Sequence, residues 1–124
     1  MRILLSNISS EPIYEQIKNE IRRQVVMGAL GDGELLPSIR KLALDLQISV
    51  ITTKRAYDDL EKEGLIATVA GKGTFVVAKN KELLREKKLK LIETKLAEAV
   101  EAAKTLGVRD REIQRLLAAL LKED

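Results

Sequence analysis

A lysine between two glycines is the first feature of the sequence that could do chemistry. Gly71, Lys72 and Gly73 lie between two apolar runs in the stretch VAGKGTFV, residues 69–76. Glycine lets the backbone bend sharply and expose its N–H groups, and the lysine adds a positive charge beside them. The stretch could therefore cradle the phosphates of a nucleotide, or form the tip of a hairpin that touches the phosphates of DNA.

The order of the residues excludes the nucleotide interpretation. A phosphate-binding P-loop has the pattern G-x-x-x-x-G-K-[ST], with a strand before it and a helix after it. Here a glycine follows Lys72, no glycine lies five residues before Gly71, and a strand pattern comes next. In a hairpin, two glycines allow positive φ angles and keep the tip narrow around one cation. Such a tip suits a DNA backbone or the minor groove.

The composition excludes most enzyme chemistry. The chain of 124 residues has no cysteine and no histidine, so it cannot form disulfides, zinc fingers, thiolate nucleophiles or catalytic triads. Carboxylates, lysines and hydroxyls are present, but they form no convergent pattern. We therefore expect no enzyme activity, no metal and no cofactor. The net charge of +3 is too small to indicate a nucleic-acid partner, so the local placement of basic residues must decide.

The apolar segments predict neither a membrane span nor a secretory signal. No stretch approaches the roughly 20 apolar residues that cross a bilayer, and the apolar run in the first ten residues is short. We expect no membrane contact and a cytoplasmic location. The length allows one compact domain with an appendage, and an aromatic content of 2% means that its core must be aliphatic.

The first helix is predicted from about residue 11 to residue 28. Pro12 favours a helix start, because the N–H group that proline lacks would have no partner in the first turn. A glycine-rich stretch after residue 27 ends the helix. Between them, aliphatic residues recur at every fourth position and form a stripe on one face: Ile13, Ile17, Ile21 and Val25.

Two more helices and a hairpin follow. Ser38 is a good N-cap for a short second helix, and Ser49 caps a third helix that ends at the next glycine. Helices joined by only two residues must cross at a steep angle, as in a helix-turn-helix. Residues 65–69 and 74–78 are rich in β-branched residues and predict strands joined by a loop over 70–73. This order is that of a winged helix.

The remaining residues predict a two-helix appendage. After Gly107 the chain can start a second helix, with Asp110 and Glu112 near the positive end of its dipole. The first helix, which begins near Lys81, carries a seam of apolar residues at alternating spacings of three and four: Leu89, Ile92, Leu96, Ala99, Ala103 and Leu106. The second carries an amphipathic stripe: Ile113, Leu116, Leu117 and Leu120.

These stripes need a partner. They could fold back on the first domain, which would then need a large apolar acceptor surface. That domain has already used its aliphatic residues for three helices and a hairpin, so we expect the stripes to pair with a second copy of the chain. We therefore divide the chain into a winged helix-turn-helix domain, residues 1–79, and a helical dimerisation region, residues 80–124.

Three motifs occur together between residues 11 and 77. They are L-P-S-x-R at 36–40, A-Y-x-x-L-E-x-E-G-L-I at 56–66, and G-K-G-T-F-V at 71–76. With these motifs the sequence resembles the DNA-binding domain of the GntR family of bacterial transcriptional regulators. The short tail is similar to that of the YtrA-type subfamily. The resemblance implies a mainly α fold with a small β-hairpin, double-stranded DNA as the partner, and a homodimer.

The resemblance also implies which residues contact DNA. Arg40 would fork onto a guanine edge or clamp a phosphate, although it could also be a solvated helix charge. Ser49, Thr52 and Lys54 occupy positions that face the major groove in the family. For each a plainer interpretation exists: a helix cap for Ser49, an inert surface residue for Thr52, and an ion pair with Asp58 for Lys54.

Two more sites complete the expected DNA contacts. Arg55 could reach a phosphate or could cover the first helix. Gly71, Lys72 and Gly73 form the tip of the wing, where the glycines are explained equally well by the tight hairpin itself. We expect Lys72 to anchor the wing on DNA.

The sequence departs from the commonest family pattern at the start of the third helix. That pattern has an arginine after the capping serine, whereas this chain has Val50 and then Ile51. Val50 cannot form a hydrogen bond with a base. Specificity would then rest on fewer direct contacts, on an apolar contact of Ile51 with a thymine methyl group, or on DNA shape.

Together these features predict a transcriptional regulator, most simply a repressor, that binds a palindromic operator as a homodimer. The alternative is a winged-helix protein-interaction module without specific DNA binding, with the tail as its adaptor. A small-molecule effector could bind in a cleft between the tail helices, but the sequence does not indicate its chemistry.

Overall fold

The computed structural model describes residues 1–123 and divides this chain into two compact units. The first unit is Met1–Leu84, and the second begins at Arg85. This boundary lies inside a long helix, later than the functional division predicted between residues 79 and 80, which stays a prediction.

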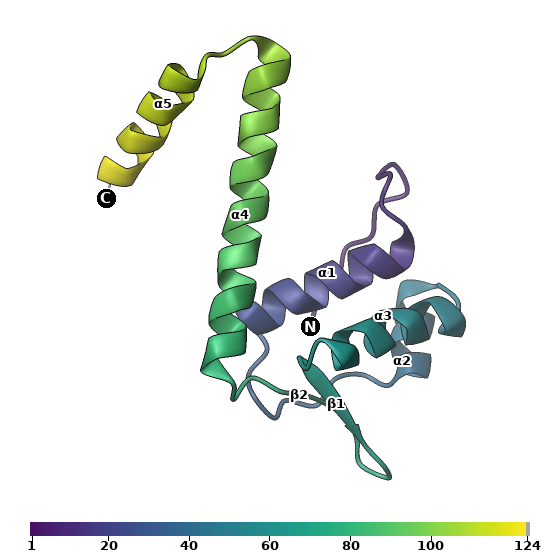
Figure 1. The fold of residues 1–124 in the computed structure, drawn as a ribbon. Helices are drawn as coiled ribbons and strands as arrows, with labels where there is room; N and C mark the ends of the chain where they lie inside the picture. Colours follow the sequence, from purple (N-terminus) through teal and green to yellow (C-terminus); the bar gives the residue numbers. More distant parts are fainter. Residues whose placement is uncertain (124) are drawn as a thin grey trace. The chain divides into compact units, whose positions relative to one another are not determined.

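The first unit is a winged helix-turn-helix, as predicted (Figure 1). Helices α1 and α2 both pack against α3, and β1 follows directly after α3 and also contacts it. The helix α1 is shorter at both ends than predicted, because Pro12 is its N-cap and Met27 its C-cap. The elements are α1 (Ile13–Val26), α2 (Ile39–Leu46), α3 (Val50–Lys62), β1 (Ile66–Val69) and β2 (Gly73–Val76).

An aliphatic core holds these elements together. The predicted stripe of α1 supplies Ile17 and Ile21, which are fully buried, and α3 supplies Leu60, which is also fully buried. A charged clamp lies beside this core, where the guanidinium of Arg22 donates to both carboxylate oxygens of Glu63 at 2.9 and 2.7 Å. The clamp joins α1 to the C-terminal end of α3, so the orientation of α3 is fixed by both apolar and polar contacts.

Both helices of the helix-turn-helix begin at serine caps. Ser38 accepts a hydrogen bond from the N–H of Lys41, and Ser49 accepts one from the N–H of Thr52, each at 3.1 Å. The turn between the helices depends on Gln47, which has a left-handed conformation with φ 57° and ψ 47°. Side chains other than glycine and asparagine adopt this conformation infrequently. It ends α2 and lets α3 start after only three intervening residues, 47–49.

Tyr57 connects α3 to the segment before α2. Its ring is buried, and its hydroxyl donates a hydrogen bond of 2.7 Å to the carbonyl oxygen of Pro37. Burial raises the pKa of Tyr57 well above its ordinary value, because the ionised phenolate would lose its hydration. This tyrosine therefore positions the N-terminal end of α2, where Arg40 lies.

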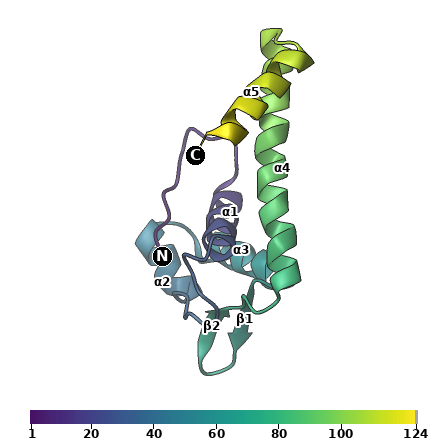
Figure 2. The same ribbon diagram turned by 90° about the vertical axis from the view of Figure 1, so that its left-hand side faces the viewer.

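The wing is an antiparallel hairpin of β1 and β2, and residues 33–36 pair with the other edge of β2. Val69 pairs with Gly73, so Gly73 belongs to β2 and the loop is one residue shorter than predicted. The N–H of Lys72 donates to the carbonyl of Val69 at 2.9 Å and closes the turn. On its other edge β2 bonds to residues 33–36, as when the N–H of Leu36 donates to the carbonyl of Thr74. Figure 2 shows the hairpin tip extending away from the three helices.

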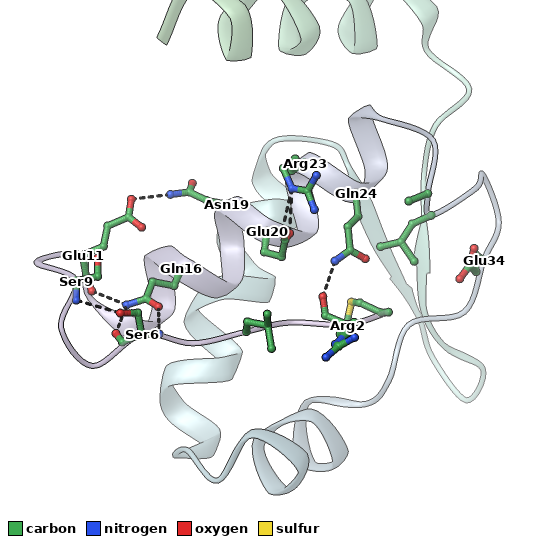
Figure 3. Close-up of a pocket in the computed structure, with 14 residues that line it drawn as sticks. Arg2, Ser6, Ser9, Glu11, Gln16, Asn19, Glu20, Arg23, Gln24 and Glu34 are labelled. Atoms are coloured by element: carbon green, nitrogen blue, oxygen red, sulfur yellow. Dashed lines mark hydrogen bonds and ion pairs between the residues drawn. The ribbon is translucent and has the colours of Figure 1, made fainter. Parts of the chain in front are cut away.

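An N-terminal arm lies along α1 (Figure 3). The side chain of Gln24 donates to the carbonyl of Arg2 at 2.7 Å, and Gln16 exchanges two hydrogen bonds with the backbone of Ser6. Ile3 of the arm is buried in the core. An open groove of about 870 Å³ runs beside the arm. None of the predicted DNA-binding residues, all in the described part of the chain, lines this groove.

The second unit consists of most of α4 (Lys81–Leu106) and of α5 (Asp110–Lys122). Gly107 ends α4 with a φ of 74°, and two carboxylates lie in the first turn of α5, as predicted. None of the described residues of α4 and α5 is buried. No helix within residues 1–123 has both the length and the hydropathy of a membrane span.

Candidate nucleic-acid interface

The outer face of α3 is the surface that a helix-turn-helix presents to DNA. The inner face carries Thr53, Ala56, Tyr57 and Leu60, all buried. At 3.6 residues per turn, Ile51 lies about two and a half turns from Leu60 and therefore on the opposite side of the helix. Ile51, Lys54 and Arg55 are all exposed there.

Ser49 and Thr52 form one hydrogen-bonded unit at the start of α3. Besides accepting from the backbone of Thr52, the Ser49 hydroxyl donates its proton to Thr52 Oγ1 at 2.7 Å. The donor of Ser49 is therefore already used inside the protein. The hydroxyl of Thr52 accepts this bond, so its own proton is left to point toward a base or a phosphate.

Lys54 and Arg55 adopt the plainer of the two arrangements that the sequence left open. The ammonium of Lys54 is 2.7 Å from a carboxylate oxygen of Asp58, one turn further along α3. The guanidinium of Arg55 lies 3.7 Å from the ring centroid of Tyr14, on α1. A stacked arginine keeps its N–H edges available, whereas the positive charge of Lys54 is partly neutralised by Asp58. The DNA contacts of both residues stay predictions.

Arg40 is the exposed cation at the start of α2. It follows Ile39 in the first turn, where the helix dipole adds positive potential for a phosphate. Within residues 1–123, Arg40 has neither an ion pair nor a side-chain hydrogen bond, whereas its neighbour Lys41 pairs with Asp45 at 3.4 Å. Its guanidinium is therefore free to fork onto a phosphate or a guanine edge.

The wing tip presents Lys72 on a backbone that requires glycine. Gly71 has a φ of 78° and Gly73 a φ of 116°, both disfavoured for other residues. A Cβ on Gly73 would also lie 3.0 Å from the side chain of Leu35, while no described atom lies within 4 Å of one on Gly71. Lys72 is exposed and forms no ion pair with any described residue. The glycines thus have a structural role, and Lys72 supplies the charge.

The predicted DNA-binding residues come from three segments of the first unit, the starts of α2 and α3 and the wing tip. In the described chain, the one hydrogen bond between two of their side chains joins Ser49 to Thr52. Two residues that support them were not foreseen: Tyr14, which holds Arg55, and Leu35, which lies against Gly73. No pattern in the sequence marks either contact, because each joins elements distant along the chain.

The second unit has an apolar cleft of about 710 Å³ between the C-terminal half of α4 and α5. Val100 and Val108 line it and were not predicted. Leu89 and Ile92 lie outside it, nearer the start of α4, and both are exposed. The other predicted interface residues all line the cleft: Leu96, Ala99, Ala103, Leu106, Ile113, Leu116, Leu117 and Leu120.

Comparison with known proteins agrees with this geometry. The family model described as "Bacterial regulatory proteins, gntR family" matches residues 13–76, from the start of α1 to the end of β2. The chain is 37% identical over 100 residues to the HTH-type transcriptional repressor YtrA of Bacillus subtilis (strain 168). This alignment covers 81% of the chain and 77% of the relative.

Two solved structures are also similar to this chain. A GntR family transcriptional regulator from Listeria monocytogenes has a TM-score of 0.77 and 28% identity, covering 97% of this chain and 100% of that one. AraR(DBD) in complex with operator ORX1 has a TM-score of 0.54 and 30% identity, covering 62% of this chain and 96% of that one. The family consists of regulators rather than enzymes. From its three motifs, its fold and these matches, the chain belongs to the GntR family of DNA-binding transcriptional regulators.

Proposed function

We propose that the protein is a cytoplasmic repressor that binds a palindromic operator as a homodimer and blocks transcription by occluding the promoter. The winged-helix unit of each copy would bind one half-site, and the tail helices would hold the two copies together. Two likenesses support this proposal: the Bacillus subtilis relative YtrA is a transcriptional repressor, and AraR(DBD) forms a complex with its operator.

The observation that carries the dimer is the exposed apolar surface of the tail. Leu106 and Leu121 are 77% and 76% exposed, and Leu116 and Leu120 are exposed to a similar degree. An apolar surface of this extent on two adjacent helices is typical of a protein interface. A second copy offers the same aliphatic surface, so pairing buries both stripes at once.

Two-fold symmetry connects the dimer to the operator. In a closed homodimer the two winged-helix units are related by a two-fold axis, so the half-sites that they bind are inverted repeats. Both half-sites contribute to binding, and a monomer loses the second contribution. For linked sites of this kind the loss is roughly 10²-fold to 10⁴-fold in affinity.

Within each half-site the roles divide by segment. The first turns of α3, including Ser49, Thr52, Lys54 and Arg55, would enter the major groove. Arg40 and the start of α2 would fix the DNA backbone, and Lys72 would anchor the wing with its glycines. Because Lys54 is already paired with Asp58, we expect Arg40 to contribute more to affinity than Lys54.

The tail cleft also limits how an effector could act. Its lining is almost entirely aliphatic, with Lys104, Asp110 and Gln114 as the polar exceptions. The same cleft is the surface that we assign to the second copy. A small molecule bound there would therefore compete with dimerisation or change its geometry.

Sedimentation of the full chain tests the proposal. We expect a dimer at micromolar concentration, and a monomer for the double variant Leu96→Glu/Leu117→Glu, which places charges in the cleft. The monomer should lose its preference for two inverted half-sites over one. The matched control is Ala97→Glu/Ala118→Glu, which adds the same charge at exposed positions outside the cleft and should remain dimeric.

Two results would contradict the proposal. One is a wild-type chain that sediments as a monomer at micromolar concentration. The other is a wild-type dimer whose affinity for a duplex is the same with one half-site as with two.

A further inference from the structure

An isoleucine is exposed on α3, the helix that we propose enters the major groove. Ile51 is 81% exposed, in the first turn of α3 and on the face opposite the core. The other outward positions in this part of α3 are charged: Lys54, Arg55 and Asp58. The adjacent Val50 is also exposed, so the first turn of the helix has an apolar tip.

Packing inside the protein does not account for Ile51. The side chains of α3 that enter the core are Thr53, Ala56, Tyr57 and Leu60, and Ile51 is not among the residues packed against them. A single exposed aliphatic residue is ordinary on a protein surface. Ile51, however, lies in the first turn of the helix that we propose enters the major groove.

The polar groups around Ile51 have little capacity left to read bases. The Ser49 hydroxyl donates to Thr52, and the Lys54 ammonium is paired with Asp58. Arg55 is stacked on Tyr14 and keeps its N–H edges, but it lies one turn further along α3 than Ile51. In this turn the free polar group is the hydroxyl proton of Thr52, so hydrogen bonding alone distinguishes few base pairs.

We propose that Ile51 reads the C5 methyl group of a thymine in each half-site. In the major groove this methyl is the apolar group that a base edge offers, and contact with an aliphatic side chain distinguishes thymine from cytosine. The proposal rests on the DNA-binding mode proposed above and names its specificity-determining residue. Thr52, one position further, would then supply a hydrogen bond to a neighbouring base or phosphate.

The experiment removes the methyl group from the DNA and the side chain from the protein. Preferred duplexes are first selected from a random pool with the full wild-type chain. Each thymine of the selected sequence is then replaced by uracil, which keeps the hydrogen-bonding groups and lacks only the methyl. Dissociation constants are measured for the wild type and for Ile51→Ala.

At one thymine per half-site, we expect uracil to weaken wild-type binding roughly threefold to fivefold, the effect of losing one buried methyl group. Substitution in both half-sites should weaken it by about tenfold or more. Ile51→Ala should bind the thymine duplex more weakly and should show no further loss with uracil. Because Ile51 is exposed, its alanine variant should melt at the wild-type temperature.

The control is Leu44→Ala, which truncates another exposed aliphatic residue, 78% exposed on α2. It should keep the full sensitivity to uracil. Equal losses with uracil in the wild type and in Ile51→Ala, at every thymine, would overturn the inference. If the selection enriches no sequence at all, the proposed function fails instead, so the two failures are distinguishable.

Discussion

The two units of the chain use aliphatic residues in opposite ways. In the winged-helix unit, Ile17, Ile21 and Leu60 are completely buried, and caps and a charged clamp complete the fold. In the tail, leucines at helical spacing remain exposed among the described residues. The same kind of pattern therefore produces a finished core in one unit and, in the other, an exposed surface that we propose as a dimer interface. A stripe marks an apolar surface, but it does not show what that surface packs against.

Truncation of a core side chain should give the largest loss of stability. It should also show that the two units respond differently to the loss of an aliphatic side chain. Ile21→Ala removes a fully buried side chain and should lower the free energy of unfolding by roughly 2–5 kcal/mol. Urea denaturation measures this, and the loss should not depend on protein concentration. The control, Leu120→Ala in the tail, should instead cause a loss that varies with protein concentration, because it acts through dimerisation. Equal, concentration-independent losses in both variants would remove the contrast.

The next effect concerns charges on the winged-helix unit. Arg40→Ala should weaken DNA binding by about 1–3 kcal/mol, because an unpaired guanidinium at a helix start is lost. Lys41→Ala is the matched control, since Lys41 is adjacent, exposed and already paired with Asp45. Its loss should be clearly smaller in the same mobility-shift titration. A larger loss for Lys41→Ala would reverse our assignment of the two residues.

A smaller effect on stability should appear at alkaline pH, and it comes from Tyr57 in the winged-helix unit. Burial raises the pKa of Tyr57 above its ordinary value of about 10, so the folded chain keeps the phenol neutral where the unfolded chain ionises it. Its contribution to stability is complete below about pH 10 and decreases as the pH rises above that value.

The variant Tyr57→Phe tests this directly. At neutral pH it should cost about 0.5–1.5 kcal/mol, the hydrogen bond to Pro37. Above pH 10 the difference in unfolding free energy between wild type and variant should shrink, as measured by urea denaturation at several pH values. A difference that stays constant up to pH 12 would show that Tyr57 does not titrate as we describe.

The smallest effect should be at the wing tip. Lys72→Ala should reduce the slope of log affinity against log salt concentration by about one unit, one phosphate contact, with little change in sequence preference. Lys90→Ala, on the exposed surface of α4, should leave the slope unchanged. An unchanged slope for Lys72→Ala would mean that the wing does not contact DNA as proposed.

Much of the winged-helix unit was predictable because its signals are local. Ser38 and Ser49 both cap helices, the every-fourth-residue stripe of α1 became the core, and the glycines at 71 and 73 have positive φ angles. Each of these depends on a few consecutive residues and on simple steric or hydrogen-bonding rules.

The remaining features depend on contacts between distant segments. Residues 33–36 pair with β2 although their sequence has no strand pattern. Residue 47 is left-handed although it is a glutamine, not the glycine that usually indicates this conformation. Tyr14 and Arg55 are distant in the sequence and meet only because α1 packs on α3. For Arg55 the sequence left two arrangements open, and the packing of α1 on α3 selects between them.

The double pairing of β2 also has a practical consequence. Because β2 bonds to β1 on one edge and to residues 33–36 on the other, its amides should exchange with deuterium slowly, while those of Ala70 and Gly71 at the tip exchange fast. The strands of the hairpin are thus held firmly, whereas its tip can be exchanged. Loops of other length or charge could be grafted at the tip to change how the wing contacts the DNA grooves, without redesign of the rest of the domain.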